Sequence, residues 1–532
     1  MGIMERPTVT ELTDGSKTWE HSYQRFHVKS YVPHNDLLGQ INNYTFKAPL
    51  LLVFEEKKQT MEEAIQFAKD TGLASIAASN DACVYFIYPN SGNWEEETEE
   101  LYCEIISEVK MDPLFQDGIC EVHNFFTKNF DGYFMKGAIF RADIYSFGAS
   151  ADYVARNLLK TVNGQYLWGP GEITPAMCSM EGLSIVPHVE RKDIGILSVN
   201  NTPSVNQAFE GCVNLLIKEK ADYIKDFYSF VRRFKMWCGI QTEEPDLEKL
   251  QLMEEAGHVE VHTSPDNIRQ YKDQPTHTVG YFAYYNKGLL DNGPVPVLLG
   301  FHGGGDSSMY LTYVAGWYAV AHKYNFLYIS FDNHLDISAT ETIEVLQELK
   351  RRYPIDAHRI YASGFSMGSG KTWDLFQEYP EVFAGLAPCS ALFPYRQNVF
   401  FEEIPEDRLN KTIPVPMFYS GGEKSFLPEL PNQAQTSLER AKYGVRVNKC
   451  KRNLDDLCYE DRDKWENPIW GINGDRTEVL HDDSRDADLT IQYFDSEDGI
   501  CRTALASVSN QEHDCRHHSI EAAWNFISQF TR

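Results

Sequence analysis

The clearest candidate for chemistry in this sequence is a serine placed between two glycines. Residues 364–368 read Gly-Phe-Ser-Met-Gly, between an apolar stretch typical of a strand and a pattern typical of a helix at 371–379. A sharp turn from strand to helix needs small residues on both sides of its central residue, and it exposes that side chain at the edge of a sheet. The pattern therefore predicts Ser366 as a nucleophile, which needs a base and an oxyanion-binding site.

A glycine-rich segment could provide the oxyanion-binding site. Residues 302–305 read His-Gly-Gly-Gly and directly follow a predicted strand. Because glycine has no side chain, the backbone N–H groups of such a segment can approach a substrate oxygen. We expect the N–H groups of Gly304, Gly305 and Met367 to bind the oxyanion, and we expect His302 to orient the loop rather than transfer protons.

The general base is expected near the C-terminus. Folds that place the nucleophile in such a turn have the chain order nucleophile, acid, histidine. His513 lies in a loop just after the apolar stretch 503–508, and it is the preferred base. His517 and His518 are closer to the last predicted helix, 520–530, and either one is the alternative.

The acid of the triad should follow the predicted strand 415–419. The next loop contains two carboxylates, Glu423 and Glu429. Either could hold the imidazole in the required tautomer. Glu423 is preferred because it is nearer to the end of the strand, and the alternative is that both are surface charges.

The elements that must position these groups alternate between strand and helix in both halves of the chain. In the second half we predict strands at 296–301, 326–331 and 359–363, with helices at 310–324 and 340–352. In the first half we predict strands at 49–54, 82–88 and 143–147, with helices at 61–78 and 94–109. This order predicts an α/β fold with two mostly parallel sheets, each with helices on both faces.

We interpret the repeated order as a duplication. It gives one domain at 1–255 and a second at 256–532, with the boundary near 245–270, where residues 241–255 are polar and charged. Within the second domain, the long segment 433–488 is expected to be an insertion, either a lid over the site or a surface excursion.

Composition excludes several classes of protein. The chain has 532 residues and a formal net charge of -28, and such a surface repels nucleic acids and anionic membranes. It has no apolar run long enough for a transmembrane helix, no signal-like N-terminus and no CxxC pair. We therefore expect a cytoplasmic protein with reduced thiols, and a homo-oligomer is compatible with the sequence.

Two further motifs are judged to be decoys. Residues 368–372 end in Gly-Lys-Thr but lack the first glycine of a phosphate-binding loop. Residues 513–518 are rich in histidine, yet no second cluster of ligands stands at a matching spacing. No metal and no cofactor is expected.

The C-terminal half resembles the α/β-hydrolase superfamily, and within it the esterase and polyhydroxybutyrate-depolymerase-like group that includes feruloyl and acetylxylan esterases. The resemblance covers roughly 275–532 and rests on the glycine segment, the serine turn, the strand and loop at 415–423 and the His513 loop. It implies hydrolysis of carboxylic esters by Ser366, with His513 as base. In this group an aspartate usually follows the strand, and Ser425 stands near that position here.

The first half resembles the same fold with its chemistry degraded. Phe-Glu-Glu-Lys at 54–57 stands where the glycine segment should be, and Asp152 takes the place of the last motif glycine. No acid follows the predicted strand 194–199. Ser150, in a second Gly-x-Ser sequence, is the one candidate nucleophile, and we expect a non-catalytic domain.

Taken together, the residues and the resemblance predict a serine esterase that acts through an acyl-enzyme on a small-molecule ester, either a small acyl ester or a phenolic or sugar-linked one. A serine peptidase or an acyltransferase with the same triad is the alternative. A non-catalytic binding or scaffold protein is the second alternative.

Overall fold

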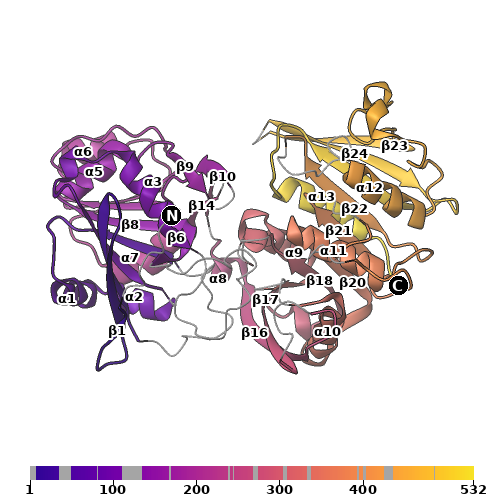
Figure 1. Cartoon of the computed structure of the whole chain (residues 1–532), viewed down its shortest axis with the longest axis horizontal. Helices are drawn as coiled ribbons and strands as arrows, with labels where there is room; N and C mark the ends of the chain where they lie inside the picture. The colour runs from indigo at the N-terminus through magenta and orange to yellow at the C-terminus, as the bar shows by residue number, and fades with distance from the viewer. Residues whose placement is uncertain are drawn as a thin grey trace. The chain divides into compact units, whose positions relative to one another are not determined.

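The chain divides into two compact units, Met1–Pro245 (unit 1) and Asp246–Arg532 (unit 2) (Figure 1). The division lies somewhat before the predicted boundary at 255. The structure is a computed structural model, and it describes residues 8–532 except 35–48, 81, 111–134, 167–168, 238–239, 244, 268–273, 304–307, 309, 332–336, 392–394, 399–402, 425–434 and 484–485.

Unit 2 is built on a ten-stranded sheet. Its central strands are parallel, and antiparallel strands flank them on both sides. In spatial order the strands are β16 (Leu252–His262), β17 (Thr276–Asn286), β19 (Leu327–Phe331), β18 (Val295–Phe301), β20 (Ile355–Phe365), β21 (Gly385–Cys389), β22 (Met417–Gly422), β25 (Cys501–Val508), β24 (Ala487–Asp495) and β23 (Arg476–Asp482).

Helices cover both faces of this sheet. One face packs against α10 (Ala339–Arg352), α11 (Met367–Glu378) and α12 (Gln435–Val447), in a core that includes Val345, Phe376 and Val445. On the other face lie α9 (Trp317–Tyr324) and α13 (His517–Ile527). There the ring of Trp524 stacks on Phe326, with 3.8 Å between centroids.

Unit 1 contains a nine-stranded sheet. In spatial order its strands are β1 (Thr10–Glu11), β2 (Lys17–Ser22), β3 (Phe26–Val32), β5 (Val84–Pro89), β4 (Pro49–Phe54), β8 (Ala138–Phe147), β11 (Met177–Glu181), β12 (Gly195–Val199) and β13 (Leu215–Lys218). From β2 onward, the order and directions match those from β16 to β25 in unit 2. The predicted fold class, two α/β-hydrolase-like sheets, is confirmed.

Two predicted helices are interrupted by glycines. The pattern at 310–324 forms a π-helical turn, Tyr310–Val314, and then α9, because Gly316 between them has φ 94°. The pattern at 61–78 forms α1 (Met61–Thr71) and α2 (Leu73–Ser79) around Gly72, which has φ 82°. Such positive φ angles favour glycine and end a right-handed helix.

The segment 433–488, expected to be a lid or a surface excursion, contributes to the sheet and core of unit 2 in its described residues. Its helix α12 and the fully buried Trp470 belong to the main hydrophobic core. Its strand β23 pairs with β24 and extends the sheet. In the part of the chain that the structure describes, no helix has the length and apolar content that crossing a membrane requires.

Candidate active site

Ser366 occupies a strained turn between β20 and α11. Its backbone has φ 54° and ψ -114°, a region that residues with a side chain rarely adopt. A Cβ atom on Gly364 would lie 2.0 Å from the carbonyl oxygen of Gly368, and one on Gly368 would lie 1.9 Å from that of Phe301. Only glycine fits at either position, which explains the Gly-x-Ser-x-Gly spacing.

The turn brings Ser366 to His513. The Nε2 atom of His513 lies 2.9 Å from the Oγ atom of Ser366, although 147 residues separate them in the chain. Ser366 is 9% exposed, and His513 is half-buried. The ring of Phe365 packs against the imidazole, with 4.9 Å between centroids. A neutral imidazole at this distance can accept the hydroxyl proton.

The loop that carries His513 (residues 509–516, the base loop) connects β25 to α13 and is fixed at the end of β22. The N–H of Lys424 donates to the carbonyl of Gln511 at 2.8 Å. A Cβ atom on Gly422 would lie 2.4 Å from the same carbonyl oxygen. The backbone of the base loop therefore passes directly over a glycine.

The two alternative histidines lie elsewhere. His517 is the first residue of α13, and its Nδ1 lies 3.7 Å from Glu521 on the same helix. The Nε2 of His518 donates to the carbonyl of Leu480 at 3.0 Å. Within the described residues, neither contacts Ser366.

The acid of the triad is not fixed by the described residues. Glu423 is exposed and lies just after β22. Among the described residues, no hydrogen bond joins its carboxylate to His513. Desolvation raises the pKa of Glu423, and the negative charge of Asp488 raises it further. Glu429, the other predicted acid, lies outside the described residues.

One of the three predicted oxyanion donors can be placed. Met367 is the first residue of α11, so its N–H has no acceptor within the helix and lies at the positive end of the helix dipole. Gly304 and Gly305 lie outside the described residues. The buried His302 donates from Nδ1 to the carbonyl of Gly303 at 2.7 Å.

The corresponding turn of unit 1 corrects the predicted alignment of Ser150 with Ser366. Here the residue between β8 and helix α5 (Ala149–Asn157) is Gly148, with φ 51° and ψ -119°. Ser150 instead occupies the position of Gly368. Its fully buried hydroxyl donates to the carbonyl of Phe54 at 2.7 Å.

A carboxylate lies beside this turn in unit 1. A Cβ atom on Gly148 would lie 2.5 Å from Oε1 of the exposed Glu56, so a side chain at position 148 would require the Glu56 side chain to move. The preceding Glu55 is buried and forms an ion pair with the buried Lys29 at 2.9 Å. Unit 1 thus has a turn of the same conformation with glycine in place of serine at its centre.

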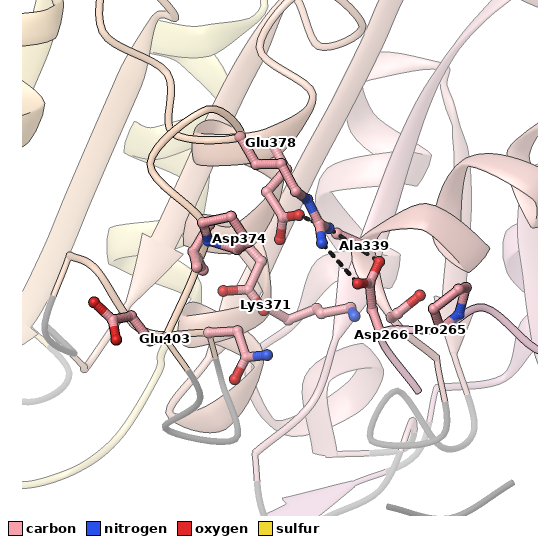
Figure 2. Close-up of a pocket in the computed structure, with 12 residues that line it drawn as sticks. Pro265, Asp266, Ala339, Lys371, Asp374, Glu378 and Glu403 are labelled. Atoms are coloured by element: carbon pink, nitrogen blue, oxygen red, sulfur yellow. Dashed lines mark hydrogen bonds and ion pairs between the residues drawn. The ribbon is translucent and has the colours of Figure 1, made fainter. Parts of the chain in front are cut away.

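A cavity of about 420 Å³ opens beside α11 in unit 2, and neither Ser366 nor His513 is among its described lining residues (Figure 2). Figure 2 shows Lys371, Asp374 and Glu378 of this helix lining it. The ammonium of Lys371 donates to the carbonyl of Ile337, and burial lowers the pKa of this lysine. Lys371, from the Gly-Lys-Thr sequence at 370–372, is thus a buried residue of unit 2.

Comparison with known proteins gave limited matches. No family model matches the chain. A stretch of 164 residues, 29% of the chain, is 27% identical to a bifunctional acetylxylan esterase/xylanase from Neocallimastix patriciarum, and it spans only 22% of that protein. An acetyl xylan esterase structure from Aspergillus awamori is similar with a TM-score of 0.33 and 13% identity, over 51% of this chain and 98% of that one. An S-formylglutathione hydrolase structure from Agrobacterium tumefaciens is similar with a TM-score of 0.32 and 10% identity, over 53% and 97%.

Proposed function

We propose that unit 2, an α/β-hydrolase-like sheet with a serine in its strand-to-helix turn, is a serine carboxylic-ester hydrolase. The observation that carries the proposal is the 2.9 Å contact between Ser366 and His513 at a strained turn. Strain of this kind is retained where it serves a reaction. The N–H group of Met367, at the start of α11, supports the same proposal because it can donate to an oxyanion.

The proposed mechanism follows from this geometry. Nε2 of His513 accepts the proton of Ser366 while Oγ attacks the ester carbonyl, and the oxyanion forms near the N–H of Met367. The protonated imidazole then donates its proton to the leaving alcohol. Water hydrolyses the acyl-enzyme, with His513 again as base. Glu423 or Glu429 is proposed to stabilise the imidazolium.

We propose a small-molecule ester as substrate, with a small acyl group or a phenolic or sugar-linked one. The acetylxylan esterase in the name of the curated relative supports a small acyl group. The matched stretch spans 22% of that relative.

The test is the hydrolysis of p-nitrophenyl acetate and butyrate by the full chain and by Ser366→Ala and His513→Ala. We expect each variant to lose at least about 1000-fold in kcat, because removing a member of such a triad leaves only oxyanion binding. Ser229→Ala, which removes an exposed hydroxyl of unit 1 that donates to the carbonyl of Lys225, is the matched control and should keep its activity. Undiminished turnover by Ser366→Ala would exclude the proposal.

A further inference from the structure

Asp514, the residue after His513, is a buried carboxylate at the centre of the base loop. It is 7% exposed. Its Oδ1 accepts hydrogen bonds from the hydroxyl of Tyr310 at 2.6 Å and from the N–H of Cys515 at 2.8 Å. Its Oδ2 accepts from Nε of Arg516 at 2.5 Å. A buried charge is tolerated only when it is paired and hydrogen-bonded, and this one is both.

The hydroxyl of Tyr310 links Asp514 to a distant part of the chain. Tyr310 begins the π-helical turn that follows the segment of the predicted oxyanion donors. Its fully buried ring packs on Phe365 with 5.1 Å between centroids, and Phe365 packs on His513. Asp514, Tyr310, Phe365 and His513 therefore form a closed ring of contacts around the nucleophile turn.

The main chain of Asp514 provides a second link. Its carbonyl accepts from the hydroxyl of Ser390 at 2.8 Å. Ser390 directly follows Cys389 of β21, and the carbonyl of Cys389 accepts from the N–H of Ser366 at 2.9 Å. One residue thus connects the base loop both to the turn of Ser366 and to the segment after the glycines.

We infer that Asp514 is a positioning residue, which holds His513 in register with Ser366 through its contacts with Tyr310 and Ser390. This inference rests on the proposed function. It is physically reasonable because a displacement of about 1 Å between reacting groups can cost on the order of 100-fold in rate. A buried carboxylate with three donors also has one favourable arrangement, so it fixes the loops it joins.

The test compares Asp514→Asn and Tyr310→Phe with the unmodified full chain, at a temperature well below the melting point of each. The measurements are kcat and KM for p-nitrophenyl acetate and the rate of labelling by a fluorophosphonate. For Asp514→Asn we expect kcat and the labelling rate to fall about 10- to 100-fold, with KM nearly unchanged. For Tyr310→Phe, which keeps the ring packing, we expect a fall of about threefold to tenfold.

The matched control is Glu341→Gln. Glu341 is also buried in unit 2, where it belongs to the capping box of α10, and it does not contact Ser366 or His513. We expect this variant to lower the melting temperature without changing kcat. A purely structural role for Asp514 predicts the same behaviour, so the split between melting temperature and kcat distinguishes the two roles.

Unchanged kcat in a folded Asp514→Asn variant would overturn the inference, and so would a change confined to KM. If Asp514→Asn does not fold, Tyr310→Phe decides in the same way, because it removes only one hydroxyl. Failure of the unmodified protein to hydrolyse the ester and to be labelled would instead reject the proposed function. The two failures are therefore distinguishable.

Discussion

At the scale of single residues, the backbone conformation of Ser366 is unfavourable for a serine in folding, and the proposed reaction explains why a serine is found there. The two units make the same turn with nearly the same angles, at Ser366 and at Gly148. Glycine adopts these angles without strain, whereas serine does not. The fold alone would favour glycine at position 366, so the serine is best explained by its hydroxyl.

We therefore predict that Ser366→Gly is more stable than Ser366→Ala, by about 1 kcal/mol in the free energy of unfolding. Both variants lack the hydroxyl, but alanine keeps the strained Cβ. Urea denaturation measures the difference. The control is Ser369→Gly, inside α11, which should be destabilised because it loses the hydrogen bond from Ser369 to the carbonyl of Ala391. Equal stability of the two variants at position 366 would contradict the prediction.

Ser366 could be predicted from the glycine spacing of the turn. His513 could be predicted from the chain order nucleophile, acid, histidine. The same approach misaligned unit 1. It followed the serine, Ser150, whereas the turn is defined by the residue between the last strand position and the first helix position, Gly148. The acid stays a prediction because no spacing rule distinguishes two carboxylates in one loop.

At the scale of elements, the end of β22 supports the base loop. The N–H groups of Glu423 and Lys424 donate to the carbonyls of Val508 and Gln511. This close approach needs a residue without a side chain at Gly422. The position of His513 therefore depends on backbone contacts between two segments that are far apart in sequence.

We predict that Gly422→Ala lowers kcat about 10- to 100-fold, because its Cβ would lie 2.2 Å from the carbonyl oxygen of Glu512 and would displace His513. Ester hydrolysis and circular dichroism measure activity and folding. Gly444→Ala in α12 is the matched control. Its Cβ would lie 3.1 Å from the end of the Met417 side chain and 3.2 Å from the ring of Trp373, so these neighbours need to shift only slightly, and activity should be unchanged. An active, folded Gly422→Ala variant would show that the loop can move without loss.

Periodicity predicted the elements of both halves but not their interruptions. The apolar pattern continues across Gly316 and Gly72, so nothing in it marks a break. The break comes from a positive φ angle, which depends on packing: a Cβ on Gly316 would lie 3.0 Å from the ring of His517. Likewise, a charge-rich composition at 433–488 did not reveal that part of this segment extends the sheet through β23.

At the scale of the whole molecule, the two sheets share their strand order, and each has a strand-to-helix turn at the same step. This supports the proposal of a duplication in which unit 1 is non-catalytic. The repeated order of strands and helices, and the absence of a glycine-rich segment after residue 54, can be read from the sequence. That Gly148 rather than Ser150 stands at the position of Ser366 cannot be read from it, because this depends on where the strand ends.

The difference between Ser366 and the turn of unit 1 predicts how many labels a serine-reactive probe adds to each chain. An excess of fluorophosphonate should add one label per chain, located on Ser366 by peptide mapping, because the hydroxyl of Ser150 is buried and donates to the carbonyl of Phe54. Intact mass spectrometry counts the labels. Gly148→Ser is the control: a serine would be strained at φ 51°, and its Cβ would require the Glu56 side chain to move, so we expect lower stability and still one label. A second label on unit 1 of the unmodified protein would show that its turn is reactive, and the proposal of a non-catalytic unit would then fail while the role of Ser366 would stand.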